Sequence, residues 1–317
     1  MKYLFLLLCI PSLLVAQSSF EKAEQLFKQE NFSKAKPLFK TYLKANPDHV
    51  KTREYLGDIA GYAKEWDDAI DYYEDLKDEF PNSANFHFKY GGAMGMKALE
   101  ISRLRAVLYI NDIKDSFETA ATLDPKHIDV RWALVEFYIQ LPSIIGGSEE
   151  KAIGFANELL EISAVDGYLA NGYIAEYNKR PKDAETFYKK AIEIGGSPHT
   201  YEKLATHYEN NNQPKEAIET AQKSLEIHKR NTLNYQIGKV AAQYNLDAQL
   251  GLQCLQAYVK NHSIKDGVPK DWAYFRMAQI YKNIGDKQQA LTWIDKALAS
   301  RPDFKEALEE KKVLQVM

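Results

Sequence analysis

The sequence predicts an all-α fold: a solenoid of about eight helix pairs followed by one capping helix. Two observations predict it. Segments 54–81 and 275–302 both read as a helix, a short turn, a second helix and a closing proline. In addition, 34 positions separate Gly57 from Gly91 and also Pro47 from Pro81. Self-similarity at such a period is the signature of a repeat architecture, in which each unit buries its apolar face against its neighbours.

Residues 1–16 have the pattern of a secretory signal peptide. Lys2 precedes an apolar stretch that is too short for a usual membrane span and ends at Ala16. The predicted cleavage before Gln17 resembles signal peptides of the Bacteroidetes type. Cys9 lies too early in this stretch for a lipoprotein box. Removal of the signal leaves Cys254 as the one cysteine, which excludes an intramolecular disulfide and indicates a buried structural thiol.

The mature chain, residues 17–317, then divides into helix pairs that begin near residues 18, 50, 84, 128, 165, 198, 231 and 271. A small residue recurs in both helices of a pair, because two helices pack closely only where the side chains at their crossing are small. In the first helices these residues are Ala23, Gly57, Gly91, Gly172, Ala205, Gly238 and Ala278, and in the second Ala35, Ala69, Ala152, Ala184, Ala217 and Ala290. The charged helix 304–316 is expected to cap the open end.

These recurring residues make the chain resemble tetratricopeptide repeat proteins. The period, the Gly or Ala of the first helix, the Ala of the second and the terminal proline carry the resemblance, which extends over residues 17–317. It implies a single right-handed superhelical solenoid with a concave binding face. Two insertions, near 97–110 and 141–148, depart from the family pattern, as does Val135 in place of a small residue.

The two insertions each allow two interpretations. In the first, Leu104 and Leu108 belong to an apolar helical face beside Arg103 and Arg105. It is either a longer repeat helix or a helix that docks on a membrane or a partner. In the second, Gly146 and Gly147 precede Ser148 without the lysine of a phosphate-binding loop, so a turn with a Ser148 N-cap is predicted. We expect this loop to pack against the edge of the groove.

The sequence has no catalytic or metal-binding signature. HExxH, GxSxG, CxxC and Rossmann glycine patterns are absent, and His199 and His207 are spaced like surface or groove residues rather than a zinc pair. No catalytic residue, metal or cofactor is therefore predicted. The balance of 41 basic and 44 acidic residues argues against nucleic acid as a partner.

The predicted binding surface is the groove lined by the first helices, where acidic and aromatic residues are mixed. Aromatic side chains suit buried anchors, and carboxylates favour a partner segment that carries Lys or Arg. A carboxylate clamp of the co-chaperone type is not expected. The predicted groove residues are Tyr62, Phe88, Trp132, Glu136, Tyr173, Glu176, Tyr177, Glu202, Tyr235 and Trp272.

These features predict a non-enzymatic adaptor of the bacterial cell envelope that binds another protein. The expected location is the periplasm, with secretion or outer-membrane association as alternatives, and no transmembrane segment is expected after signal cleavage. A second hypothesis is a carbohydrate or small-ligand binding protein that uses groove aromatics. A third is an enzyme subunit whose chemistry lies in a partner.

Overall fold

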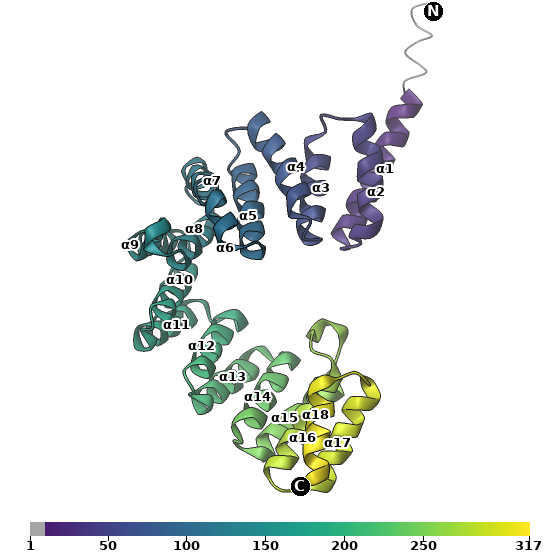
Figure 1. Ribbon diagram of the computed structural model, residues 1–317, viewed down its shortest axis with the longest axis vertical. Coiled ribbons are helices and arrows are strands. Elements are labelled where there is room, and N and C mark those ends of the chain that lie inside the picture. The colour runs from purple at the N-terminus through teal and green to yellow at the C-terminus, as the bar shows by residue number, and fades with distance from the viewer. Residues whose placement is uncertain (1–9) are drawn as a thin grey trace, which may run out of the picture. The chain divides into compact units, whose positions relative to one another are not determined.

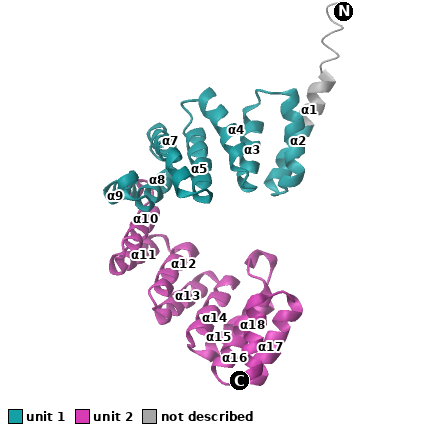
Figure 2. Ribbon diagram, in the orientation of Figure 1, with its two compact units in different colours: residues 1–158 teal, residues 159–317 magenta. Residues whose placement is uncertain are grey.

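The computed structural model describes the backbone of residues 10–317 and the side chains from residue 19 onward. All elements in this part of the chain are helices, arranged as eight successive pairs and a final helix (Figure 1). The all-α class and the repeat of helix pairs are thus confirmed. The chain divides into two compact units, Met1–Glu158 and Leu159–Met317, with the boundary inside one helix (Figure 2).

Unit 1 holds the first four pairs. The third pair is interrupted by short helical turns between its two long helices. In order, its elements are α1 (Ile10–Lys28), α2 (Phe32–Ala45), α3 (Val50–Tyr62), α4 (Trp66–Glu79), α5 (Ala84–Glu100), α6 (Arg103–Ala106), η1 (Val107–Tyr109), α7 (Ile110–Leu123), α8 (Ile128–Gln140), η2 (Ser143–Ile145) and α9 (Glu149–Ile162).

Unit 2 holds the other four pairs and the last helix. Its elements are α10 (Ala164–Tyr177), α11 (Pro181–Gly195), α12 (Pro198–Asn210), α13 (Pro214–His228), α14 (Asn231–Tyr244), α15 (Ala248–Asn261), η3 (Ile264–Asp266), α16 (Lys270–Asn283), α17 (Lys287–Ser300) and α18 (Lys305–Val316). Ala307 and Leu314 of α18 are buried in the same cluster as Phe304 and α17, while its other face is charged.

The small residues lie where the helices of a pair cross. A Cβ atom added to Gly57 would stand 2.6 Å from the ring of Tyr73, and one on Gly172 would stand 2.4 Å from Tyr188. These distances are shorter than any van der Waals contact, so each pair closes only because the first helix has no side chain there. The alanines of the second helices are equally buried: Ala35, Ala69, Ala152, Ala184 and Ala290 are fully enclosed.

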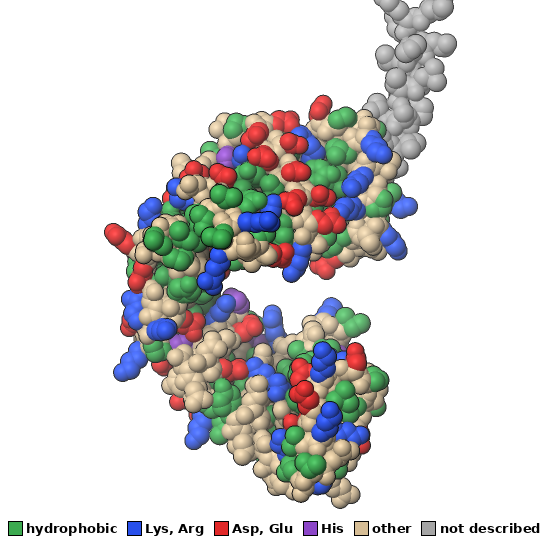
Figure 3. Space-filling view, in the orientation of Figure 1, with side chains coloured by type: hydrophobic (Ala, Val, Ile, Leu, Met, Phe, Trp, Pro, Cys, Tyr) green, Lys and Arg blue, Asp and Glu red, His purple; other side chains and the backbone are tan. Residues whose placement is uncertain are grey.

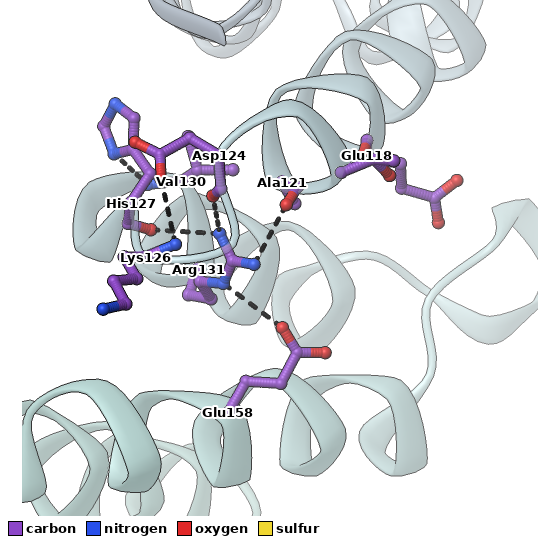
Figure 4. A network of polar contacts seen from close by, with 9 residues as sticks. Glu118, Ala121, Asp124, Lys126, His127, Val130, Arg131 and Glu158 are labelled. Carbon is purple, nitrogen blue, oxygen red and sulfur yellow. Dashed lines mark hydrogen bonds and ion pairs between the residues drawn. The ribbon is translucent and has the colours of Figure 1, made fainter.

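A buried arginine ties the third and fourth pairs of unit 1 together (Figure 4). Arg131 of α8 is only 3% exposed. Its guanidinium donates to the carbonyl oxygens of Ala121 (3.0 Å) and Asp124 (2.7 Å) at the end of α7. It also donates to the Glu158 carboxylate on α9, at 3.2 Å. The cation therefore satisfies carbonyls that the end of a helix leaves without partners.

The first insertion differs from a simple longer helix. Helix α5 has 17 residues against 13 in α3, but it ends at Glu100, where the backbone of Ile101 turns extended. The chain then forms α6 and η1 before α7 begins. The helical path is therefore broken at Ile101 and Ser102, and it resumes as α6 and η1, which lead directly into α7.

The second insertion forms a turn. Gly146 has φ of 105°, a left-handed conformation that favours glycine, and the Ser148 hydroxyl accepts from the backbone N–H of Lys151 at 3.2 Å. Ile144 is almost fully exposed, so it does not pack against a neighbouring helix as expected.

The predicted signal peptide falls largely outside the described residues, which begin at residue 10. Its cleavage, the periplasmic location and the handedness of the superhelix stay predictions.

Candidate functional site

Carboxylates of the first helices pair with side chains of the following repeat, at a spacing of about one repeat. Lys89 lies 2.7 Å from Glu54 and 2.6 Å from Asp58, and Asn85 donates to Glu54 at 2.9 Å. The pairs Glu54–Asn85 and Asp58–Lys89 are each 31 residues apart. We call this series of contacts between successive repeats the carboxylate ladder.

The same spacing recurs in both units. In unit 1 the Tyr55 hydroxyl donates to Glu24 at 2.8 Å, and in unit 2 His207 Nδ1 lies 2.8 Å from Glu176. The ladder therefore arises from the register between adjacent repeats, which brings residues 31 apart onto neighbouring first helices.

Tyrosines of the second helices complete the ladder. The Tyr73 hydroxyl donates to Asp58 at 2.6 Å, and the Tyr188 hydroxyl donates to Glu176 at 2.7 Å. Burial raises the pKa of Glu176, but hydrogen bonds from His207 and Tyr188 outweigh it, so the pKa is lowered. The lowered pKa keeps the Glu176 carboxylate ionised, and its hydrogen bonds are made within the protein.

The arrangement bears on two predictions. Glu176, predicted as a groove residue, has a side chain that is 27% exposed and a carboxylate that accepts from Tyr188 and faces His207. His207 was expected at the surface or in the groove, but it is 1% exposed and faces Glu176. His199 is exposed, as predicted.

Glu202 on α12 does not take part in the ladder. The residue 31 positions further on is Leu233, which has no polar group. The side chain of Glu202 is 63% exposed, and Nδ1 of the exposed His199 imidazole lies 3.9 Å from its carboxylate. This carboxylate is therefore available to a partner in a way that Glu54, Asp58 and Glu176 are not.

Glu202 stands at a cavity of about 280 Å³ between α12, α13 and α14 of unit 2, which we call the α12–α14 cavity. Apolar walls come from Leu233, Ile237 and Val240 on α14 and from Ile218 on α13. Three carboxylates and one guanidinium also line it. Of the carboxylates, Glu209 is paired with Lys239 (2.8 Å), and Asp266 accepts from the Ser263 backbone N–H (2.6 Å); the remaining two charged groups are Glu202 and Arg230.

Two buried polar atoms in the lining have no hydrogen-bond partner among the described residues. They are the Ser224 hydroxyl oxygen and Oε1 of Gln236. Buried polar groups are nearly always paired, because an unmade hydrogen bond costs about 1–3 kcal/mol. Ser224 is fully buried, and the equivalent residues of other repeats are apolar: Leu76, Leu159, Ala191 and Ala297.

A second hollow brings three predicted residues together. Tyr173, Glu176 and Tyr177 of α10 line an open depression of about 500 Å³, with Pro181 of α11 and the Asn210 and Asn211 amides at the end of α12. We call it the α10–α12 depression. It lies one repeat before the α12–α14 cavity along the chain.

The other predicted residues have separate surroundings. Tyr62 is exposed and stacks on Phe32 with centroids 4.5 Å apart, whereas Phe88 packs near Phe117 and His127. Trp132 is half-buried and Glu136 is exposed on α8.

Two aromatics predicted for the groove pack against core clusters. Tyr235 is buried against Tyr258, although it also lines the α12–α14 cavity. Trp272 packs edge-on against Phe304 at 4.6 Å in the C-terminal cluster. The sequence predicted Tyr235 of α14 and Trp272 of α16 at the surface because it does not show which side chains of other helices pack against them.

Cys254 is buried, as predicted, and burial raises its pKa to about 11, so the thiol is neutral and unreactive at neutral pH. Within residues 19–317, His, Cys, Asp and Glu side chains form no group of three that could hold a metal ion. Over the helices that the structure describes, none is both long and apolar enough to cross a bilayer.

Comparisons with known proteins agree with this architecture. Two family models, both described as tetratricopeptide repeat, match the chain, one at residues 20–84 and the other at residues 273–304. A solved structure of a tetratricopeptide repeat protein from Parabacteroides merdae is 13% identical; the match covers 95% of this chain and 98% of that chain, with a TM-score of 0.52. The chain contains tetratricopeptide repeats.

Two further similarities are weaker. The protein YrrB, described as a TPR protein with an unusual peptide-binding site, is 22% identical; the match covers 62% of this chain and 97% of that one, with a TM-score of 0.44. The human protein O-mannosyl-transferase TMTC3 is 21% identical, with 86% of this chain and 30% of the human protein covered. The chain therefore spans less than a third of that relative.

Proposed function

We propose that this protein is a non-enzymatic protein–protein interaction scaffold. Its first helices in unit 2 would bind an extended segment of a partner protein. The observation that carries the proposal is the α12–α14 cavity, with the uncommitted Glu202 carboxylate and two buried polar atoms that have no partner in the described chain. A tetratricopeptide repeat fold supports this role, since repeats stack into extended binding surfaces.

The cavity fits a Lys or Arg side chain. The apolar walls formed by Leu233 and Val240 would cover the aliphatic stem, and long basic side chains commonly bury their stems in this way. Ser224, Gln236 and Glu202 offer acceptors to the charged head. The tyrosines of the α10–α12 depression would contact neighbouring residues of the same segment.

Carbohydrate binding is the weaker proposal. A volume of about 280 Å³ lies at the lower end of ligand pockets, which suits one side chain better than a sugar chain. Tyr201 and Tyr235 are buried, and Trp272 is half-buried with its ring edge-on against Phe304, so these rings offer little open stacking face. Export to the cell envelope remains part of the proposal and rests on residues 1–16.

The test is a binding screen of short peptides with one fixed central residue, Lys, Arg, Leu or Glu in turn. The purified protein should retain Lys and Arg peptides over Leu and Glu peptides. Glu202→Gln should weaken the selected basic peptide about five- to tenfold, because the charge interaction at the rim is lost. Glu219→Gln, a change at an exposed carboxylate of α13 outside the cavity, should change affinity less than twofold.

Two results would overturn the proposal. One is a screen in which basic peptides bind no better than acidic ones. The other is a selected basic peptide whose affinity falls equally in Glu202→Gln and Glu219→Gln.

A further inference from the structure

The connection between α5 and α7 in unit 1 carries apolar side chains that the fold does not cover. Leu99, Leu104 and Leu108 are 72%, 88% and 77% exposed, and Val107 is also exposed. Single exposed apolar residues are ordinary, but a cluster within ten positions marks an interaction site. In Figure 3 hydrophobic side chains gather over the part of unit 1 that carries α6, α7 and α8.

These side chains share one face. Leu104, Val107 and Leu108 have the i, i+3, i+4 spacing of neighbours on a helical surface, and α6 and η1 provide the helical path. The base of the connection is fixed, because the Lys97 ammonium lies 5.1 Å from the centre of the Tyr109 ring. The segment is therefore a preformed protrusion.

The charge beside this face is basic. Arg103 and Arg105 flank Leu104, both are exposed, and neither guanidinium group has a hydrogen-bond or ion-pair partner among the described residues. The preceding carboxylate, Glu100, is paired with Lys64 at 3.6 Å. Between residues 101 and 111 the chain has two arginines and no acidic residue.

We propose that the protrusion formed by residues 99–108 docks on the surface of an anionic lipid bilayer. The leucines enter the boundary between headgroups and acyl chains, and the two guanidinium groups bind lipid phosphates. A bilayer fits better than a protein groove because it accepts nearly fully exposed side chains without a matching shape. Arginines beside buried leucines reach phosphates at the interface, and anionic lipids attract such charges. Since the described helices include no membrane span, the contact is interfacial.

The experiment is co-sedimentation of the purified protein with vesicles of phosphatidylcholine alone or with added phosphatidylglycerol. The protein should bind the anionic vesicles, and the paired change Leu104→Ser and Leu108→Ser should weaken this binding about tenfold. Arg103→Gln with Arg105→Gln should remove most of the preference for anionic over neutral vesicles.

The matched control is Ile194→Ser with Ile227→Ser, which removes two exposed apolar side chains from α11 and α13 of unit 2. It should leave vesicle binding unchanged. The proposal is overturned if the wild type does not sediment with anionic vesicles, or if the leucine pair and the control pair behave alike. Loss of a protein contact in the leucine variant, with vesicle binding unchanged, would also overturn it and assign the protrusion to a protein partner.

Discussion

Glu54 in unit 1 and Glu202 in unit 2 occupy corresponding places on first helices, yet their surroundings are opposite. Glu54 accepts from Asn85, 31 residues later, and from Lys89, while the residue 31 positions after Glu202 is Leu233. The first carboxylate joins two repeats, and the second stays open beside a cavity. Whether an acidic first helix is structural or available to bind therefore depends on one residue in the next repeat.

The largest expected effect tests whether internal cations stabilise unit 1 at all. Arg131→Lys should lower the free energy of unfolding by about 2–4 kcal/mol. A lysine ammonium is a single point charge and cannot replace the planar fork that reaches both the Ala121 and Asp124 carbonyls. The Glu158 pair adds little, since that carboxylate is half exposed.

Chemical denaturation measures this change, with Arg103→Lys as the exposed control. A loss at Arg131 no greater than that at Arg103 would mean that the network does not stabilise the repeats.

The next expected effect breaks the ladder at Lys89. Lys89→Met keeps the apolar stem but removes the ammonium shared by Glu54 and Asp58, and should cost about 1–2 kcal/mol of unfolding free energy. The exposed Lys40 on α2 gives the matched control, Lys40→Met, for which we expect a change below about 0.5 kcal/mol. Equal stabilities would show that the ladder is incidental.

The helix pairs could be predicted from the sequence, whereas the contacts of the carboxylate ladder could not be predicted from any single repeat. Gly57, Gly172 and the recurring alanines predicted the helix pairs, because packing at a crossing depends on local residue size. The ladder depends on register between repeats, which no single segment contains. A comparison of polar residues 31 positions apart, such as Glu176 and His207, is the sequence signal that predicts the carboxylate ladder.

Two other features could not be predicted from single segments, because they depend on residues that lie close in space. Tyr235 and Trp272 were expected in the groove, but Tyr235 is buried against Tyr258 and Trp272 is half-buried against Phe304. Ser224 went unnoticed, although it is polar at the position where other second helices have Leu76 or Ala191. Comparing the repeats position by position would have singled it out.

A substitution at Ser224 distinguishes a role in binding from a role in folding. Ser224→Ala should leave the free energy of unfolding unchanged or raise it by up to about 1 kcal/mol, because the hydroxyl has no partner within the described chain. The affinity for a selected basic peptide should fall a few-fold at the same time. A variant that is clearly less stable, with unchanged affinity, would assign Ser224 to the fold instead.

The smallest effect is a pH dependence at Glu24. Hydrogen bonds from Lys51, Tyr55 and Lys28 lower the pKa of Glu24 from 4.5 to about 2. A lowered folded-state pKa contributes stability above the unfolded pKa, and this contribution is lost as pH falls from about 4.5 towards 2.

Glu24→Gln should therefore be less stable than the wild type at pH 7, and the difference should shrink below about pH 4.5. Thermal unfolding across this range measures it. A difference independent of pH would contradict the assigned hydrogen bonds.

The account rests most directly on the claim that Glu202 is open because Leu233 is apolar. The decisive measurement is calorimetric binding of the selected basic peptide to Leu233→Lys, which places a cation at the position that Lys89 occupies relative to Asp58. We predict a loss of affinity of about tenfold or more, with the fold retained by circular dichroism. Unchanged affinity would contradict the claim that the uncommitted carboxylate recognises the partner.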